Sequence, residues 1–181
     1  EAIAEVLHAQ GGVTPRVIDP VMVATSGDRL VDEKAVGAIR TELVPRARLV
    51  TPNAPEAEVL TGKPVETIDG QRRAAERLLE LGANGALVKG GHIGGKVIHD
   101  VLQTTTGEWI FESPRIDTTS THGTGCTLAS AIAALLAQGR SVPEAVEQGR
   151  DYLHGAIKAA KGFGKGHGPV HHGWLLDELK K

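Results

Sequence analysis

Cysteine and aromatic residues are scarce in this sequence of 181 residues. There is one cysteine, and aromatic residues make up 3% of the chain. A single cysteine excludes an internal disulfide framework and fits a reducing compartment, so we expect a cytoplasmic protein. No apolar run is long enough to span a bilayer, which argues against a membrane protein. The net charge of −2 predicts no broad basic surface for nucleic acid.

Glycine, in contrast, is abundant, with 23 residues in a chain that is 40% hydrophobic. This composition favours an α/β enzyme with tight turns over an all-β binding module. Short apolar runs and helical patterns predict strands at 16–24, 47–53 and 85–91 and helices at 2–10, 33–43, 54–62 and 69–81. Strands that alternate with helices predict a mostly parallel sheet covered on both faces.

The second part of the sequence predicts a hairpin followed by helices. Two stretches, 96–103 and 108–116, are joined by Thr-Thr-Thr-Gly and favour an antiparallel pair. Helices are expected at 126–138, 143–161 and 174–181, with a glycine-rich loop at 162–173. Asp69 is the candidate N-cap of the helix that it begins. We find no internal repeat or linker and expect one domain over residues 1–181.

Four polar residues fall at or just after predicted strand ends: Asp19, Asn53, Glu56 and Lys89. Because ligands bind beyond the carboxyl ends of the strands in parallel sheets, these residues form a first candidate site. Asn53 and Glu56 share one face of a helix start, where a carboxylate can hold a hydrated Mg²⁺. The same pair also fits an N-cap asparagine with a first-turn glutamate, which is ordinary helix chemistry.

Lys89 and Asp19 each have two interpretations. Lys89 suits phosphate as a point charge, but a solvated lysine before a turn has the same pattern. Asp19 ends a strand and is a candidate for orienting a substrate or binding a metal, although an aspartate before a proline also starts turns. The stretch 90–96 nearly matches a phosphate-binding P-loop. We reject that match because Val97 stands where a metal-binding hydroxyl should be and a strand pattern follows.

The stretch THGTGCTLASAIAALLAQG, residues 121–139, is a second candidate site. Gly123 and Gly125 leave backbone N–H groups accessible, and the helix that follows presents its positive end. Together these features make an anion site that suits phosphate. The same field favours a thiolate at Cys126. The alternative is a buried structural cysteine after an ordinary glycine turn, and we expect the apolar helix itself to be buried.

Three histidines in the glycine-rich loop, His167, His171 and His172, raise the question of a metal site. Their spacing lacks a helical or zinc-finger context, so we interpret them as loop histidines. The GFGKGHG stretch in the same loop follows no strand and is therefore not a dinucleotide-binding fingerprint.

The stretch IDTTSTHGTGCTLASAIAA resembles the anion-hole motif of the ribokinase-like superfamily. Within it, THGTGC resembles the hydroxymethylpyrimidine/phosphomethylpyrimidine kinases of thiamine biosynthesis. VIDPVMVATSGDRL, LVTPNAPEAEVLTG, VKGGH and GKGHGPVHH are similar to that family in the same order, so the resemblance covers nearly the whole chain. It implies a three-layer α/β/α ribokinase-like fold. It also implies ATP-dependent phosphorylation of 4-amino-5-hydroxymethyl-2-methylpyrimidine and of its monophosphate, giving the diphosphate used in thiamine synthesis.

The resemblance further implies residue roles, with ATP and Mg²⁺ as ligands. A cysteine takes the place of the superfamily's catalytic aspartate, so Cys126 would accept the proton of the substrate hydroxyl. The amides of Gly123, Thr124 and Gly125 would stabilise the transferring phosphoryl group. The implied nucleotide-binding residues are Asn53, Lys89, Gly91, Thr118, Gly123 and Gly125. The implied substrate-binding residues are Asp19, Val21 and Cys126, and the implied metal-binding residues are Glu56 and Asp19.

Two other functions fit the same sequence. One is pyridoxal or pyridoxine kinase activity, because relatives share the cysteine-bearing motif. The other is a non-catalytic pyrimidine- or nucleotide-binding module.

We also expect a homodimer. Family members carry an N-terminal segment with the first strands and the pyrimidine clamp, so we expect residues 1–181 to be the C-terminal portion of one kinase domain. Alone, this portion is expected to aggregate or to be unstable, and not to phosphorylate the pyrimidine.

Overall fold

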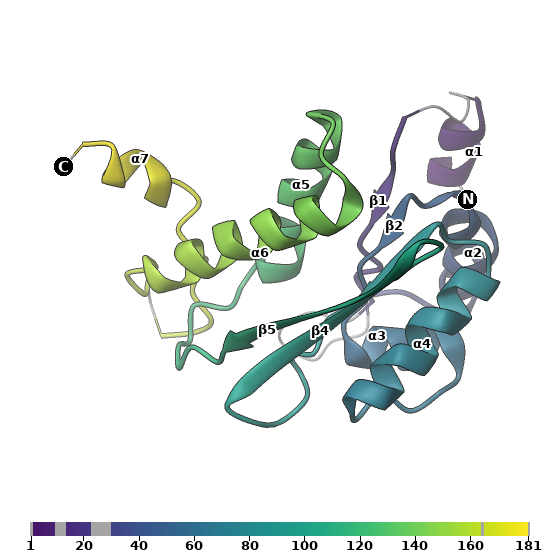
Figure 1. Cartoon of the computed structure of the whole chain (residues 1–181), viewed down its shortest axis with the longest axis horizontal. Helices are drawn as coiled ribbons and strands as arrows, with labels where there is room; N and C mark the ends of the chain where they lie inside the picture. The colour runs from purple at the N-terminus through teal and green to yellow at the C-terminus, as the bar shows by residue number, and fades with distance from the viewer. Residues whose placement is uncertain (1, 10–13, 23–29, 164, 181) are drawn as a thin grey trace. The chain divides into compact units, whose positions relative to one another are not determined.

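The computed structural model describes residues 2–9, 14–22, 30–163 and 165–180 (Figure 1). The chain divides into two compact units, Glu1–Pro114 and Arg115–Lys181. The first unit contains a sheet and four α-helices, and the second contains three α-helices among its described residues. The predicted helix end at Gly11 and Gly12, and positions 23 and 24 of the predicted strand 16–24, lie outside the described residues.

The first unit begins with α1 (Ala2–Ala9), β1 (Val17–Ile18) and α2 (Glu33–Ala38). After α2 the helix widens in the π-helical segment η1 (Ile39–Leu43), which lies within the predicted helix 33–43. It then tightens in the 3₁₀ segment η2 (Val44–Arg46), which the sequence pattern did not predict. It continues through β2 (Leu49–Val50), α3 (Ala54–Thr61), α4 (Ile68–Glu80), β3 (Gly85–Val88), β4 (Val97–Thr104) and β5 (Gly107–Pro114).

The five strands form one sheet in the order β1-β2-β3-β4-β5. The β1–β2 and β2–β3 pairs are parallel, whereas the β3–β4 and β4–β5 pairs are antiparallel. The expected mostly parallel sheet is therefore wrong for the described strands, because their sheet is mixed. The reason is the length of the connections: helices cross over between the first three strands, while the later connections are too short for a crossover.

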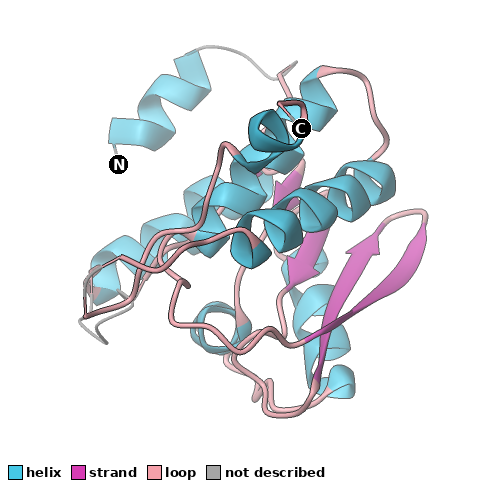
Figure 2. Cartoon of the chain, turned by 90° about the vertical axis from the view of Figure 1, so that its left-hand side faces the viewer, coloured by secondary structure: helices cyan, strands magenta, loops and turns pink. Residues whose placement is uncertain are grey.

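The β4–β5 hairpin confirms the antiparallel pair predicted for the second part of the sequence (Figure 2). Its turn lies between Thr104 and Gly107, which are paired at the hairpin end. One capping prediction is wrong. Thr67, not Asp69, is the N-cap of α4, because the Thr67 hydroxyl accepts a hydrogen bond from the Gly70 amide at 3.1 Å. Asp69 lies in the first turn and pairs with Arg72 instead.

The hydrophobic core of the first unit lies between its helices and the central strands. α4 packs on β3 and β4, and α3 packs on α4. The buried apolar side chains of this core come from the sheet and from α2 to α4, among them Val36, Val50, Leu60, Leu78 and Val88. β3 is buried at all four positions, as expected for a central strand.

The second unit is a helical hairpin with a C-terminal extension. α5 (Thr124–Ala137) packs against α6 (Val142–Lys158), and α7 (Trp174–Glu178) follows a loop. Gly149 on α6 allows close approach, since a Cβ there would lie 3.0 Å from Ile132 of α5. α5 was expected to be buried throughout, but its residues Cys126, Ser130 and Ala133 are exposed. Within the described part of the chain, no helix has the length and apolar character needed to cross a bilayer.

Candidate functional site

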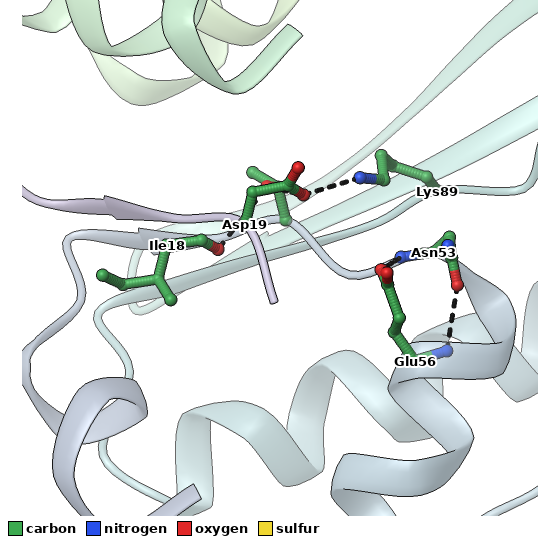
Figure 3. A network of polar contacts seen from close by, with 6 residues as sticks. Ile18, Asp19, Asn53, Glu56 and Lys89 are labelled. Atoms are coloured by element: carbon green, nitrogen blue, oxygen red, sulfur yellow. Dashed lines mark hydrogen bonds and ion pairs between the residues drawn. The ribbon is translucent and has the colours of Figure 1, made fainter. Parts of the chain in front are cut away.

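Asp19 and Lys89 form an ion pair at the carboxyl end of the parallel strands. The Lys89 Nζ atom lies 2.9 Å from Asp19 Oδ1, and both side chains are largely buried (Figure 3). The buried Thr51 hydroxyl donates to the same oxygen at 3.0 Å. The interpretation of Lys89 as a solvated lysine before a turn is therefore wrong, because its ammonium group is held in place by a carboxylate.

Strand pairing brings these side chains together from distant parts of the sequence. Asp19 follows β1, Asn53 follows β2 and Lys89 follows β3. The Lys89 amide donates to the Pro52 carbonyl at 2.9 Å, and Asn53 and Lys89 form a parallel bridge. The parallel strands thus end at one edge and place their following residues side by side, as the sequence predicted.

Asn53 and Glu56 form a reciprocal capping box at the start of α3. Asn53 Oδ1 accepts from the Glu56 amide at 2.9 Å, and Glu56 Oε2 accepts from the Asn53 amide at 2.8 Å (Figure 3). The interpretation of the pair as helix-capping residues is confirmed. The cap also fixes the carboxylate of Glu56 at the sheet edge, so the structural role and a ligand-binding role are compatible.

Glu56 is buried, which is unusual for an acidic residue: only 5% of its surface is exposed. Burial raises the pKa of Glu56 above its ordinary value. Hydrogen bonds from the Asn53 and Met22 backbones and the charge of Lys89 act against that rise, while the charge of Asp19 adds to it. A cation bound near this buried carboxyl group would stabilise its ionised form.

Two buried residues that sequence analysis missed hold the backbone around Lys89. The Gln71 side-chain amide donates to the Val88 carbonyl at 2.9 Å and to the His99 carbonyl at 2.8 Å. The Asp100 carboxylate accepts from the Gly90 amide at 2.8 Å. The available sequence signal was a polar residue, Gln71, at a position that lies on the apolar face of the helix pattern. Its hydrogen-bond partners are set by tertiary structure.

Gly90 is required at this point, because a Cβ there would collide with the His99 backbone oxygen. The following residues turn, with the Ile93 amide donating to the Gly90 carbonyl at 2.9 Å, and Gly91 is exposed in that turn. Val97 begins β4 rather than a helix, which confirms the rejection of a P-loop. Val21 is 41% exposed, and its amide donates to the Asp19 carbonyl in a turn at 2.9 Å.

The remaining predicted site residues belong to the second unit. Gly123 is the N-cap of α5 and has a φ of +79°, a left-handed conformation that favours glycine. It offers no capping side chain, so the first-turn amides of Thr124, Gly125 and Cys126 have no such cap. Cys126 is exposed, and the interpretation as a buried structural cysteine is therefore wrong. Thr118 precedes this turn, and its hydroxyl accepts from the Ser120 amide at 3.0 Å.

The loop histidines make separate hydrogen bonds rather than one cluster. His167 faces Thr121, His171 pairs with Asp177, and His172 faces Thr127. Across the described ranges, no group of three or more histidine, cysteine or acidic residues could by itself hold a metal ion. The three histidines lie between α6 and α7, in the loop that the sequence predicted.

Two carboxylates of the first unit fit the implied Mg²⁺. Mg²⁺ takes oxygen ligands and is usually bound through one or two carboxylates together with water and phosphate oxygens. Glu56 and Asp19 supply carboxylates at the same sheet edge, and the burial of Glu56 makes a neighbouring cation favourable. These residues therefore suit a Mg²⁺ ion whose other ligands come from a bound phosphate and water.

The chain is an α/β protein. It has polar side chains after the carboxyl ends of its parallel strands and a glycine turn at the N-terminus of α5. A family model, phosphomethylpyrimidine kinase, matches residues 1–171. The chain belongs to this phosphomethylpyrimidine kinase family. The hydroxymethylpyrimidine/phosphomethylpyrimidine kinase of Streptomyces coelicolor is 46% identical over 178 residues, which cover 98% of this chain and 65% of that protein.

Solved structures show the same fold. A Bacillus subtilis pyridoxal kinase in complex with ADP superposes with a TM-score of 0.86 and 32% identity, over 97% of this chain and 65% of that one. A phosphomethylpyrimidine kinase from Clostridium difficile 630 has a TM-score of 0.73 and 35% identity, over 86% of this chain and 62% of that one. The fold is therefore α/β and ribokinase-like. The chain spans just under two thirds of the length of these relatives.

Proposed function

We propose that the protein transfers the γ-phosphoryl group of ATP to 4-amino-5-hydroxymethyl-2-methylpyrimidine and then to its monophosphate, for thiamine synthesis. The observation that carries this proposal is the turn at the start of α5. There a left-handed Gly123 leaves the first-turn amides without a capping side chain, and Cys126 is exposed beside them. Family membership makes a phosphoryl acceptor with a hydroxymethyl group the substrate that best explains this turn.

The chemistry assigns one role to each part of the turn. Cys126 as a thiolate accepts the proton of the substrate hydroxyl, and the hydroxyl oxygen bonds to the γ-phosphorus of ATP. The bond from that phosphorus to the oxygen bridging it to ADP breaks, and ADP leaves. The amides of Gly123, Thr124 and Gly125 stabilise negative charge on the transferring group.

The residues of the first unit support the nucleotide and its metal. Lys89 supplies a fixed positive charge for phosphate oxygens, because Asp19 holds its ammonium group. Asn53 and Gly91, together with Thr118, Gly123 and Gly125 of the second unit, complete the proposed nucleotide-binding set. Mg²⁺, when bound through Glu56 and Asp19, neutralises phosphate charge. Asp19 also belongs to the proposed substrate-binding set, together with Val21 and Cys126.

We further propose that the two compact units are parts of one kinase domain with three layers, and that the protein is a homodimer. The ADP complex of a similar pyridoxal kinase supports the choice of an adenine nucleotide as ligand. Light scattering of the full-length protein tests the dimer, and a single mass equal to one chain would contradict it.

The proposed activity is tested by product analysis with the full-length protein. We expect mass spectrometry to detect first the monophosphate and then the diphosphate of the pyrimidine, formed from ATP and Mg²⁺. Absence of both products from a folded protein that still binds ADP would contradict the proposal. That result would instead support a non-catalytic nucleotide-binding module.

Pyridoxal phosphorylation is the second candidate function. The observation in its favour is the TM-score of 0.87 with a Staphylococcus aureus pyridoxal kinase in complex with pyridoxal, at 30% identity. Comparing kcat/KM for the pyrimidine and for pyridoxal separates the two. We expect the pyrimidine to be the better substrate, and a higher kcat/KM for pyridoxal would reverse the assignment.

A further inference from the structure

The hydroxyl of Thr127 links the glycine turn to the C-terminal histidine segment, residues 167–172. Thr127 Oγ1 lies 2.7 Å from the Gly123 carbonyl oxygen and 3.0 Å from His172 Nε2. A carbonyl oxygen accepts and cannot donate, so the single hydroxyl hydrogen goes to Gly123. His172 must then donate to Thr127 through its Nε2–H, which fixes the protonation of that ring nitrogen.

The Gly123 carbonyl is thereby held by two groups of the same residue. Its oxygen accepts from the Thr127 amide at 2.9 Å as well as from the hydroxyl. The Thr124 amide shares a rigid peptide plane with this carbonyl, so fixing one fixes the direction of the other. Because Thr127 is 6% exposed, water competes little for these hydrogen bonds.

The histidine segment is tied to the same turn at a second place. The His122 amide donates to the Gly168 carbonyl at 3.0 Å, and the Gly168 amide donates to the Thr119 carbonyl at 3.2 Å. The Thr121 hydroxyl lies 3.3 Å from His167 Nδ1. These contacts hold the residues before Gly123, while His172 acts through Thr127 on the Gly123 carbonyl itself.

Two hydrogen bonds connect the histidine segment to helix α6. The Tyr152 hydroxyl donates to the His172 carbonyl at 2.8 Å, and the His171 amide donates to the Ala156 carbonyl at 2.9 Å. Contacts with α6 therefore fix the backbone of His172, and from this position its ring reaches Thr127. The hydrogen bonds run from α6 through His172 and Thr127 to the glycine turn.

We propose that His172 is a positioning residue that orients the phosphate-binding turn 123–126 through the Thr127 hydroxyl. The proposal rests on the proposed function, because it assigns the turn a phosphate to bind. It goes beyond that function by giving the C-terminal histidine segment a role, with no contact between His172 and the phosphate.

The first test measures the ring protonation of His172 in the full-length protein. We expect ¹⁵N NMR to show hydrogen on Nε2, assigned by the loss of that signal in His172→Gln. A neutral ring with its hydrogen on Nδ1 would overturn the proposal, because it could not donate to Thr127. This result does not depend on whether the protein is a kinase.

The second test compares ADP binding between matched variants by calorimetry. Thr127→Val keeps the shape and removes the hydroxyl, whereas Thr127→Ser keeps the hydroxyl. We expect Thr127→Val and His172→Phe to weaken ADP binding about three- to tenfold, the usual effect of losing one or two hydrogen bonds. Thr127→Ser should restore wild-type affinity. His154→Gln is the control, since His154 lies on α6 and makes none of the hydrogen bonds described above.

The outcomes separate the two proposals. If Thr127→Val and His172→Phe bind ADP as tightly as His154→Gln, the positioning role is wrong. If Thr127→Val does not fold, failure of Thr127→Ser to restore ADP affinity counts equally against it. If the wild-type protein binds ADP but transfers no phosphoryl group, the proposed kinase function fails while the positioning role stands.

Discussion

At the scale of single residues, the candidate site combines side chains whose environments differ sharply. Glu56 is buried and capped by Asn53, whereas Cys126 is exposed at the first turn of a helix. Charge on Glu56 therefore costs free energy that a bound cation can offset, while Cys126 is accessible to a substrate. These differences lead to separate predictions for the two residues.

Replacing Cys126 by serine should remove the general base and leave nucleotide binding intact. A serine hydroxyl is uncharged at neutral pH and cannot accept the substrate proton as a thiolate does. We expect kcat to fall by about 10²–10⁴-fold, the usual contribution of a general base, with little change in KM for ATP. Steady-state kinetics of the full-length protein measure both values, and wild-type turnover in Cys126→Ser would contradict the role.

Glu56→Gln should raise the Mg²⁺ concentration needed for half-maximal rate. Glutamine keeps the size of the side chain, and its amide oxygen can still complete the capping box, so the change isolates the charge. The measurement is the initial rate as a function of Mg²⁺ at saturating ATP. An unchanged Mg²⁺ dependence would leave Glu56 with its capping role alone.

The raised pKa of Glu56 also predicts how stability depends on pH. The folded protein holds this proton to higher pH than the unfolded chain, whose glutamate has the ordinary pKa of 4.5. The contribution of Glu56 to the free energy of unfolding is therefore complete below pH 4.5 and is lost as pH rises through its folded pKa. Urea unfolding should show this loss in the wild type and not in Glu56→Gln. The same pH profile in both proteins would contradict it.

At the scale of elements, α7 depends on a glycine of α6. Trp174 at the start of α7 donates through its indole N–H to the Tyr152 carbonyl at 3.1 Å. A Cβ on Gly155 would overlap the Trp174 ring. The close fit between the two helices therefore requires a residue without a side chain at Gly155.

Gly155→Ala should displace Trp174 and destabilise the second unit. We expect a loss of about 1–3 kcal/mol, the usual cost of overpacking, with a shift in tryptophan fluorescence. Gly37→Ala is the control, because a Cβ on this helical glycine meets no atom within 4 Å. That variant should be unchanged or slightly stabilised. Equal thermal midpoints for the two variants would show that α7 accommodates the added methyl group.

At the scale of the whole molecule, the chain forms two compact units although its sequence predicts one domain. The two tryptophans report on one unit each, because Trp109 lies in the first and Trp174 in the second. If the units belong to one domain, they should unfold together. Single-tryptophan variants made by Trp109→Phe and Trp174→Phe should give the same urea midpoint. Two separate midpoints would show that the units are independent domains.

Local patterns predicted the elements whose stabilising contacts are close in sequence. The β4–β5 hairpin was predicted because its strands are joined by a short turn, and the α3 cap because Asn53 and Glu56 are three residues apart. The N-cap of α4 was missed because Thr67 and Asp69 are both good capping residues, and the backbone geometry selected Thr67. The mixed sheet was missed because the hairpin was predicted as a pair of its own, without its antiparallel pairing to β3.

The glycine turn before α5, the polar residues after the parallel strands and the family could all be predicted from the amino-acid sequence. These features depend on residue type and short spacing. Which side chains contact one another across long stretches of sequence became clear only from the folded structure. The ion pair of Asp19 and Lys89 joins residues 70 positions apart, and the His172–Thr127 hydrogen bond spans 45. Such pairs form because packing of the cores closes long loops and fixes register, which no local pattern encodes.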